Sequence, residues 1–216
     1  MTKATPPVLL SPLEPCLPVR SAALCTIAQM TAAHLVGPLG DRWSHTVGVA
    51  RCAADLASAL SLPGDELVAA AWLHDIGVAR AAVITGFHPL DGAHYLTAQL
   101  WPMRIVGLVA HHSGARFVAT VRGLGPALAE YPDEGGLMSD ALTYADQTVD
   151  TTGRRVSAHQ RRAAMLRRHG PDSWNAAVDH IRAPCLSAAV ARIENDLLRA
   201  GCSSAGRRSR RVIPAG

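Results

Sequence analysis

Apolar residues recur at helical spacing along most of the 216-residue chain. One stripe carries His45, Val49, Cys52, Ala53 and Leu56, whose offsets match a helical period of about 3.6 residues. Alanine and leucine, which favour helices, are abundant, and no stretch alternates apolar and polar residues over the length of a strand. The pattern therefore predicts an all-α fold.

Caps, glycines and prolines indicate where these helices begin and end. A helix is expected between a cap at Asp41 or Ser44 and the turn that begins at Leu62. A later helical region, at residues 172–199, should be interrupted at Pro184, because proline removes a backbone donor. Further helices are predicted at residues 19–36, 65–76, 89–100, 103–112, 139–150 and 158–169, with a loop-rich insertion between Pro126 and residue 136.

The composition divides the chain into three segments. Residues 1–18 contain five prolines and should form a non-helical arm. Residues 19–200 should form one helical domain with a C-terminal helical extension. Residues 201–216 are rich in glycine, serine and arginine and are expected to be a flexible basic tail.

The charge of the chain does not favour nucleic acid as a partner. The formal charge is +4, and arginine supplies the excess, much of it in residues 154–168 and 207–211. Aromatic residues make up only 4% of the chain and are not interleaved with these arginines. The arginines at 154–168 fit a solvated helix face, with a phosphate-rich partner as the alternative.

Cysteine usage and hydropathy favour a cytoplasmic location. The five cysteines are scattered and show no zinc-knuckle spacing, so we expect free thiols in a reducing compartment. No run of about 18 uncharged apolar residues predicts a membrane span, and no secretory signal is recognisable. Neither a membrane nor a particular oligomeric state is indicated.

Histidine and aspartate recur at the ends of apolar segments. The neighbouring pair His74-Asp75 ends one such segment, and Gly77 is expected to let the chain leave the helix through a left-handed residue. Taken singly, each histidine could be a core residue bonded to a nearby acceptor. Together they favour one shared metal site, because every buried polar group needs a partner. The candidates are His45, His74, Asp75, His88, His111, His112 and Asp146.

Three short segments place some of these residues in a fixed order. They are Arg42-Trp43-Ser44-His45-Thr46-Val47-Gly48-Val49-Ala50, Ala71-Trp72-Leu73-His74-Asp75-Ile76-Gly77 and Tyr144-Ala145-Asp146. The order of a histidine, a His-Asp pair and a later aspartate resembles the HD-domain superfamily of metal-dependent phosphohydrolases, over about residues 40–150. The resemblance implies an HD-type helical bundle with additional C-terminal helices.

The resemblance also implies a set of metal ligands. His45, His74, Asp75 and Asp146 would hold one ion. In the two-metal branch, which includes HD-GYP phosphodiesterases and bacterial dinucleoside-tetraphosphate hydrolases, Asp75 would bridge to a second ion held by His88 and His111. His111 is preferred to His112 because the H-x-S/T-G run places it in register. His112 would then contact the substrate or lie behind the ligands.

The chain departs from the family at residues that would contact phosphate. Many two-metal members have lysine where Val78 stands, and Arg80 is a candidate replacement. Arg116 and Arg122 are further candidates, with a surface role as the alternative for each. The acidic and Gly-Tyr-Pro residues of HD-GYP proteins are absent after His112, which disfavours cleavage of cyclic dinucleotides.

The leading hypothesis is a metal-dependent phosphohydrolase that acts on a small phosphorylated metabolite, a nucleotide in the favoured version. Metal-bound hydroxide would be the nucleophile, and the catalytic residues would be Asp75, His112 and Arg116. The cofactor would be a divalent metal, binuclear and Fe or Mn in the favoured version, with Zn, Ni, Co and Mg also compatible. The alternatives are an HD-type di-iron oxygenase and a non-catalytic regulatory or binding module.

Overall fold

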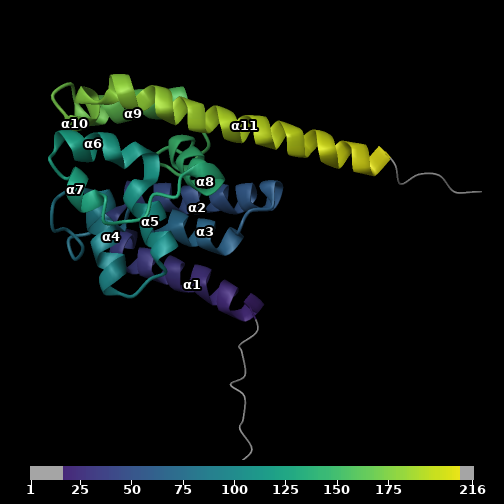
Figure 1. Cartoon of the computed structure of the whole chain (residues 1–216), viewed down its shortest axis with the longest axis horizontal. Coiled ribbons are helices and arrows are strands. Elements are labelled where there is room, and N and C mark those ends of the chain that lie inside the picture. The colour runs from purple at the N-terminus through teal and green to yellow at the C-terminus, as the bar shows by residue number, and fades with distance from the viewer. Residues whose placement is uncertain (1–16, 210–216) are drawn as a thin grey trace, which may run out of the picture.

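The computed structural model describes residues 17–209, with side chains from residue 23 to residue 201, and it confirms an all-α fold (Figure 1). Within these residues the backbone forms no strand, and Val149 and Arg155 make an isolated β-bridge. The helices are α1 Leu17–Val36, α2 Asp41–Leu60, α3 Gly64–Leu73, α4 His88–Ala98, α5 Met103–His111, α6 Ala115–Val121, α7 Gly125–Leu128, α8 Gly136–Gln147, α9 Ala158–His169, α10 Trp174–Ala177 and α11 Asp179–Ser209. Short 3-10 helices cover Gly37–Leu39 (η1), Ile76–Val78 (η2) and His112–Gly114 (η3).

The central helix of the bundle is α3, which packs against α1, α2, α5 and α8. Its alanines at residues 69–71 are fully buried, as are Leu67 and Leu73. Small side chains let neighbouring helices approach closely, and burial on several sides explains why this helix has no broad polar face. The C-terminal end of α3, from which His74 and Asp75 follow, is therefore held inside the core.

The C-terminal helices lie on the side of the bundle opposite α1 (Figure 1). The long helix α11 packs against α8, and Val190 and Ile193 of α11 are buried. The C-terminal part of α11 extends beyond the other helices (Figure 1). The helices α9 and α10 pack against each other and reach α8 and α6, respectively. α9 contacts α8, and α11 contacts α2 and η3, so these helices lie beside the elements that carry His45, His112 and Asp146.

Both ends of the described chain differ from the predicted boundaries. α1 starts at Leu17 and includes Pro18 in its first turn, where a backbone donor has no partner within the helix. α11 continues through Pro184, so the predicted interruption there is wrong, and residues 201–209 extend the helix into the predicted tail. The rest of the predicted arm, residues 1–16, and of the predicted tail, residues 210–216, lie outside the described residues.

The internal boundaries differ where helices end early or where short helices form. α3 ends at Leu73 rather than at residue 76, and η2 follows it. The predicted loop-rich insertion contains the short helix α7, whose Pro126 occupies one of the first two positions, and the helix α8 begins at Gly136 rather than at residue 139. Local sequence leaves such boundaries open because caps and tertiary packing decide the last turn.

Two expectations from composition concern cysteines and membranes. Cys25, Cys52 and Cys185 are free thiols. None of the helices within residues 17–209 is both long and apolar enough to cross a membrane.

Gly77 has a different role from the one that the sequence predicts. It lies in η2 and is not among the glycines with positive φ. A Cβ atom at this position would lie 2.0 Å from the carbonyl oxygen of His88 and 2.5 Å from the backbone nitrogen of Gly92. The prediction of a left-handed exit from α3 is therefore wrong: glycine is needed because the backbone of α4 packs directly on residue 77.

Gly77→Ala should lower the free energy of unfolding by about 3 kcal/mol or more, because the added methyl group overlaps backbone atoms that cannot move independently. Thermal or chemical unfolding followed by circular dichroism measures this change. Gly125→Ala is the matched control, since nothing lies within 4 Å of a Cβ at residue 125. Equal stability of the two variants would contradict the packing argument.

Candidate metal centre

Six polar side chains from five parts of the bundle meet at its centre. His45 comes from the N-terminal part of α2, and Asp146 comes from the last turn of α8. His74 and Asp75 follow α3, His88 is the first residue of α4, and His112 follows α5. Helix ends supply these residues because a chain that leaves a helix can turn two neighbouring side chains toward the same point. Two groups with metal-ligand spacing result: His45, His74 and Asp146, and Asp75, His88 and His112.

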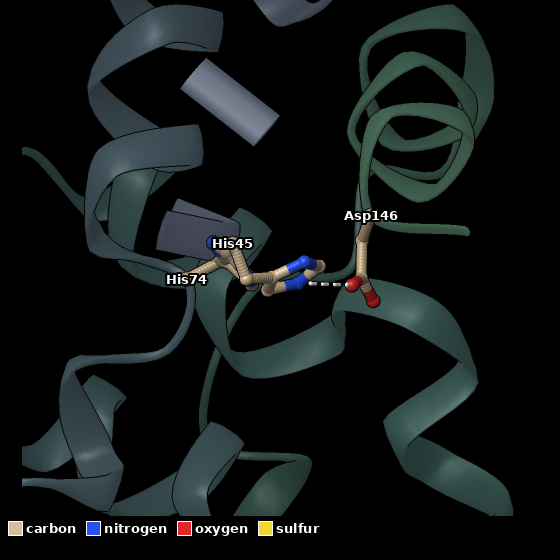
Figure 2. A group of neighbouring side chains, drawn as sticks. All are labelled: His45, His74 and Asp146. Carbon is tan, nitrogen blue, oxygen red and sulfur yellow. Dashed lines mark hydrogen bonds and ion pairs between the residues drawn. The ribbon is translucent and has the colours of Figure 1, made fainter. Parts of the chain in front are cut away.

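In the first group, atoms from α2 and α8 face each other directly (Figure 2). Nε2 of His45 is 3.0 Å from Oδ1 of Asp146, as the dashed line in Figure 2 marks. The His74 ring packs edge-on against His45, with ring centres 5.5 Å apart. All three residues are buried, and His74 is fully buried. This arrangement brings residues 101 positions apart in the sequence into contact.

Asp75 connects the two groups. Its Oδ2 atom is 3.2 Å from Nε2 of His74 and 4.0 Å from Nε2 of His45, and its Oδ1 atom is 3.3 Å from Nε2 of His88. The His112 ring lies 5.3 Å from both the His74 and His88 rings, measured between centres. One carboxylate therefore has an oxygen toward each group, which is the geometry of a bridging ligand.

Hydrogen bonds to backbone carbonyls set the orientation of three imidazoles. Nδ1 of His45 is 3.1 Å from the carbonyl oxygen of Asp150, Nδ1 of His74 is 2.7 Å from that of Ala71, and Nδ1 of His112 is 2.6 Å from that of Val109. A carbonyl only accepts, so each Nδ1 must carry the proton. In the neutral ring, Nε2 then keeps its lone pair.

These lone pairs face carboxylate oxygens, which are also acceptors. Nε2 of His74 is buried and makes no hydrogen bond, although Asp75 Oδ2 lies near it. Such a cluster of buried acceptors is unfavourable unless a proton or a metal ion supplies positive charge. A histidine that donates one ring N–H to a carbonyl and presents the other nitrogen is also the usual form of a metal-ligating imidazole. The donor set therefore fits a divalent cation.

The electrostatics of the carboxylates agree with this geometry. Burial opposes ionisation of Asp75, but His74 and the Arg42 guanidinium, 2.6 Å away, hold its pKa well below the ordinary value. Burial likewise opposes ionisation of Asp146, and the neighbouring His45 and Arg161 hold its pKa well below the ordinary value. Both side chains are consequently anionic at neutral pH.

The histidines are not equivalent. Burial and the neighbouring cations lower the pKa of His88 to about 3, although 38% of its side chain is open to the adjacent cavity. Burial and His74 also lower the pKa of His112. Burial opposes protonation of His74, but the neighbouring Asp75 raises its pKa above the ordinary value. His88 and His112 are thus kept neutral and can act as ligands, while the neighbouring Asp75 favours positive charge at His74.

His111 and Arg116, both predicted to belong to the site, lie elsewhere. Nε2 of His111 donates to the carbonyl oxygen of Tyr131 at 3.0 Å, and its ring lines a separate cavity of about 420 Å³. Arg116 is exposed and lines that second cavity. Successive helical residues point about 100° apart, and α5 ends at His111, so His112 alone of the pair turns to the centre. The structure therefore places His112, not His111, among the potential ligands.

A cavity of about 440 Å³ opens beside the two groups and is lined by arginine. Of the predicted phosphate contacts, Arg122 lines it and Arg80 does not. The other arginines in its wall were not predicted to contact a substrate: Arg42, Arg161, Arg168 and Arg182.

A signal for two of these arginines was present in the sequence. Arg161 and Arg168 are seven residues apart on α9 and therefore lie on one face, whereas Arg162 points to Asp179. Arg161 is buried, and its NH2 group is 3.3 Å from Nε2 of His45 and 3.4 Å from Oδ1 of Asp146. A solvated helix face therefore does not describe the whole arginine-rich segment.

Ser113 and Gln147 hold the Asp146 carboxylate from the side opposite His45. The Ser113 hydroxyl donates to Oδ2 of Asp146, and the Gln147 amide donates to the same oxygen at 3.0 Å and to the Ser113 hydroxyl at 3.1 Å. Ser113 has φ 50° and ψ 37°, a left-handed conformation that is uncommon for residues other than glycine. This turn therefore places His112 at the centre and lets the next residue, Ser113, donate a hydrogen bond to Asp146.

The depressed pKa of His88 predicts a specific pH dependence for the metal-free protein. Between the ordinary pKa of 6.5 and the folded pKa of about 3, the unfolded chain binds a proton at residue 88 and the folded chain does not. Stability from this residue therefore declines as pH falls through that window. His88→Gln should lose less stability than the wild type between pH 7.5 and pH 5 in chemical denaturation with a chelator present. An unchanged difference between the two pH values would refute the assignment.

Comparison with known proteins agrees with this geometry. A family model described as HD domain matches residues 42–148. No significant match was found to a curated protein or to a solved structure. The matched segment contains His45, the pair His74-Asp75 and Asp146, in the order that the sequence analysis recognised. The chain belongs to the HD-domain superfamily.

Proposed function

We propose that the protein is a metal-dependent phosphohydrolase that cleaves a phosphoester or phosphoanhydride of a small metabolite, a nucleotide in the favoured form. The observation that carries the proposal is a set of buried imidazole lone pairs and carboxylates that face one another in the wall of an arginine-lined cavity. The first feature fits divalent metal, and the second fits a phosphate group.

The proposed ligand sets follow the two groups. His45, His74 and Asp146, with Oδ2 of Asp75, would hold one ion, and Oδ1 of Asp75, with His88 and His112, would hold a second. Imidazole with carboxylate suits Fe, Mn, Co, Ni or Zn better than Mg, and we favour Fe or Mn. A bound ion pair supplies Lewis acidity, which lowers the pKa of a water molecule and offsets charge on a phosphoryl group.

The protein residues have separate tasks in this proposal. Arg42 donates to Asp75, and Arg161 donates to Asp146, so each carboxylate is held in place by a guanidinium that also faces the cavity. Arg122 is anchored by the carbonyl oxygens of Gly86 and Thr85, at 2.9 and 3.0 Å, and keeps its charge available to a phosphate. Preorganised cations of this kind stabilise charge that develops during phosphoryl transfer.

The same cavity also bears on the two alternative functions, a di-iron oxygenase and a regulatory module. A di-iron oxygenase would use similar ligands but has no general need for several arginines beside them. A purely regulatory module has no need for a complete set of six buried or partly buried ligand candidates. The arginine-lined wall next to the ligand groups therefore favours phosphate chemistry over both.

Metal binding should distinguish His112 from its neighbour. His112→Ala should lower the metal content from about two ions per chain toward one, because it removes a ligand of the second group. His111→Ala is the matched control and should keep the wild-type content, since its Nε2 atom bonds to Tyr131. Elemental analysis after loading with Mn or Fe and desalting measures both. Loss of metal in the His111 variant alone would instead support His111 as the ligand, as the sequence resemblance implies.

Hydrolysis tests the proposed reaction directly. The Mn- or Fe-loaded protein should release phosphate from members of a panel of nucleotides and generic phosphoesters. Asp75→Asn should reduce the turnover by about 100-fold or more, because a bridging carboxylate and its charge are lost. Arg80→Gln is the control and should retain activity, since Arg80 is exposed and does not line the cavity. Full metal occupancy without turnover of any phosphorylated compound, together with substrate-dependent oxygen consumption, would favour the oxygenase.

A further inference from the structure

Three arginines of the cavity have no acidic partner. Arg122 donates to backbone carbonyls, and Arg182 donates to the carbonyl oxygen of Ser113 at 2.9 Å and to Oδ1 of Asn175 at 2.8 Å. Arg168 makes neither a hydrogen bond nor an ion pair with any residue between 17 and 209. By contrast, Arg42 and Arg161 already face the carboxylates at the metal groups.

The surroundings of Arg168, Arg182 and His169 disfavour positive charge on each of them. Burial, together with Arg42 and Arg161, lowers the pKa of Arg168, and burial also lowers that of Arg182. Burial and four arginines, with Arg168 first among them, lower the pKa of the neighbouring His169. One further acidic residue of the wall, Asp172, is exposed and forms no ion pair within the described chain. Among the described residues, Arg168 and Arg182 outnumber Asp172 at this end of the cavity, so its net charge is positive.

An aromatic side chain lies in the same wall. Trp174, the first residue of α10, is 55% exposed and lines the cavity. The Ser173 hydroxyl, which accepts from the backbone N–H of Ala176, fixes the start of this helix. Asn175, the next residue, is bonded to Arg182. An exposed indole held beside a cationic surface offers a flat face on which a nucleobase can stack.

These residues come from the part of the chain that follows the HD match. The family model ends at residue 148, whereas Arg168, Trp174 and Arg182 belong to α9, α10 and α11. α10 packs against α6, and α9 packs against α8, so the C-terminal helices close the cavity from outside the segment that matches the HD model. The family match thus accounts for the ligand groups but not for this wall.

We propose that Arg168, Arg182 and Trp174 form a recognition subsite for a nucleoside that carries more than one phosphate group. Arg168 and Arg182 bind a phosphate that is not at the metal groups, and Trp174 stacks on the base. The cavity, of about 440 Å³, has the size of pockets that hold a single small ligand. The proposal rests on the proposed function for the identity of the cleaved bond, but the binding that it predicts needs no metal and no turnover.

Binding to the metal-free, full-length protein tests the subsite. In calorimetric titrations with a chelator present, ATP and inorganic tripolyphosphate should bind at least about tenfold more tightly than AMP and inorganic phosphate, respectively. Arg168→Gln should weaken binding of ATP and tripolyphosphate by about tenfold. Because Arg168 makes no hydrogen bond or ion pair among the described residues, this change removes no such contact from the fold.

Arg167→Gln is the matched control. Residue 167 is the neighbour of Arg168 on α9 and is likewise exposed, but it does not line the cavity, and its replacement changes the net charge equally. Its affinities should stay within about twofold of the wild type. Equal losses in the two variants would mean that only the overall positive charge matters and would overturn the subsite.

Trp174 is tested separately from the arginines. Trp174→Ala should weaken ATP binding by about tenfold and leave tripolyphosphate binding unchanged, because only ATP has a base. Trp174→Phe should keep most of the affinity for ATP. Equal binding of AMP and ATP would overturn the second phosphate contact, and unchanged ATP binding by Trp174→Ala would overturn the base contact. An inactive but ATP-binding protein would instead contradict the proposed function alone.

Discussion

The structure depends on a concentration of buried acceptor atoms at its centre. Imidazole lone pairs from His45, His74 and His112 face carboxylates, and each ring is held by a backbone carbonyl on its other side. Such an arrangement is stable only with positive charge close by. The protein supplies part of it through Arg42 and Arg161, and a divalent ion fits the rest. The excess of acceptors over donors at this centre is the basis of the proposed metal site.

The bundle around this centre is built to bring helix ends together. The fully buried alanines of α3 allow neighbouring helices to approach closely, and Gly77 allows the backbone of α4 to pack on the turn after α3. His88 is the first residue of α4, so the same close approach sets its distance from Asp75. The packing of these small residues therefore also fixes the positions of the ligand groups. A substitution that disturbs the packing should displace His88 from Asp75.

The arginine-lined cavity divides into two parts with different origins. The ligand candidates all lie in the segment that matches the HD model, and two arginines pair with their carboxylates: Arg42 from that segment and Arg161 from α9. Arg168 of α9 and Arg182 of α11 follow that segment and make no ion pair within the described residues. In our proposals, the HD segment supplies the metal ligands and the additional helices supply the recognition subsite.

The sequence by itself determined the all-α class, the region of α9 and the order of His45, His74-Asp75 and Asp146, because helical periodicity and ligand chemistry are local properties of the chain. Tertiary structure decided that His112 rather than His111 faces the centre, that Arg116 lies at another cavity, and that Arg161 and Arg168 line the main one. The physical reason is rotation: neighbouring helical residues point about 100° apart, so a side chain's target depends on where its helix ends and what packs against it.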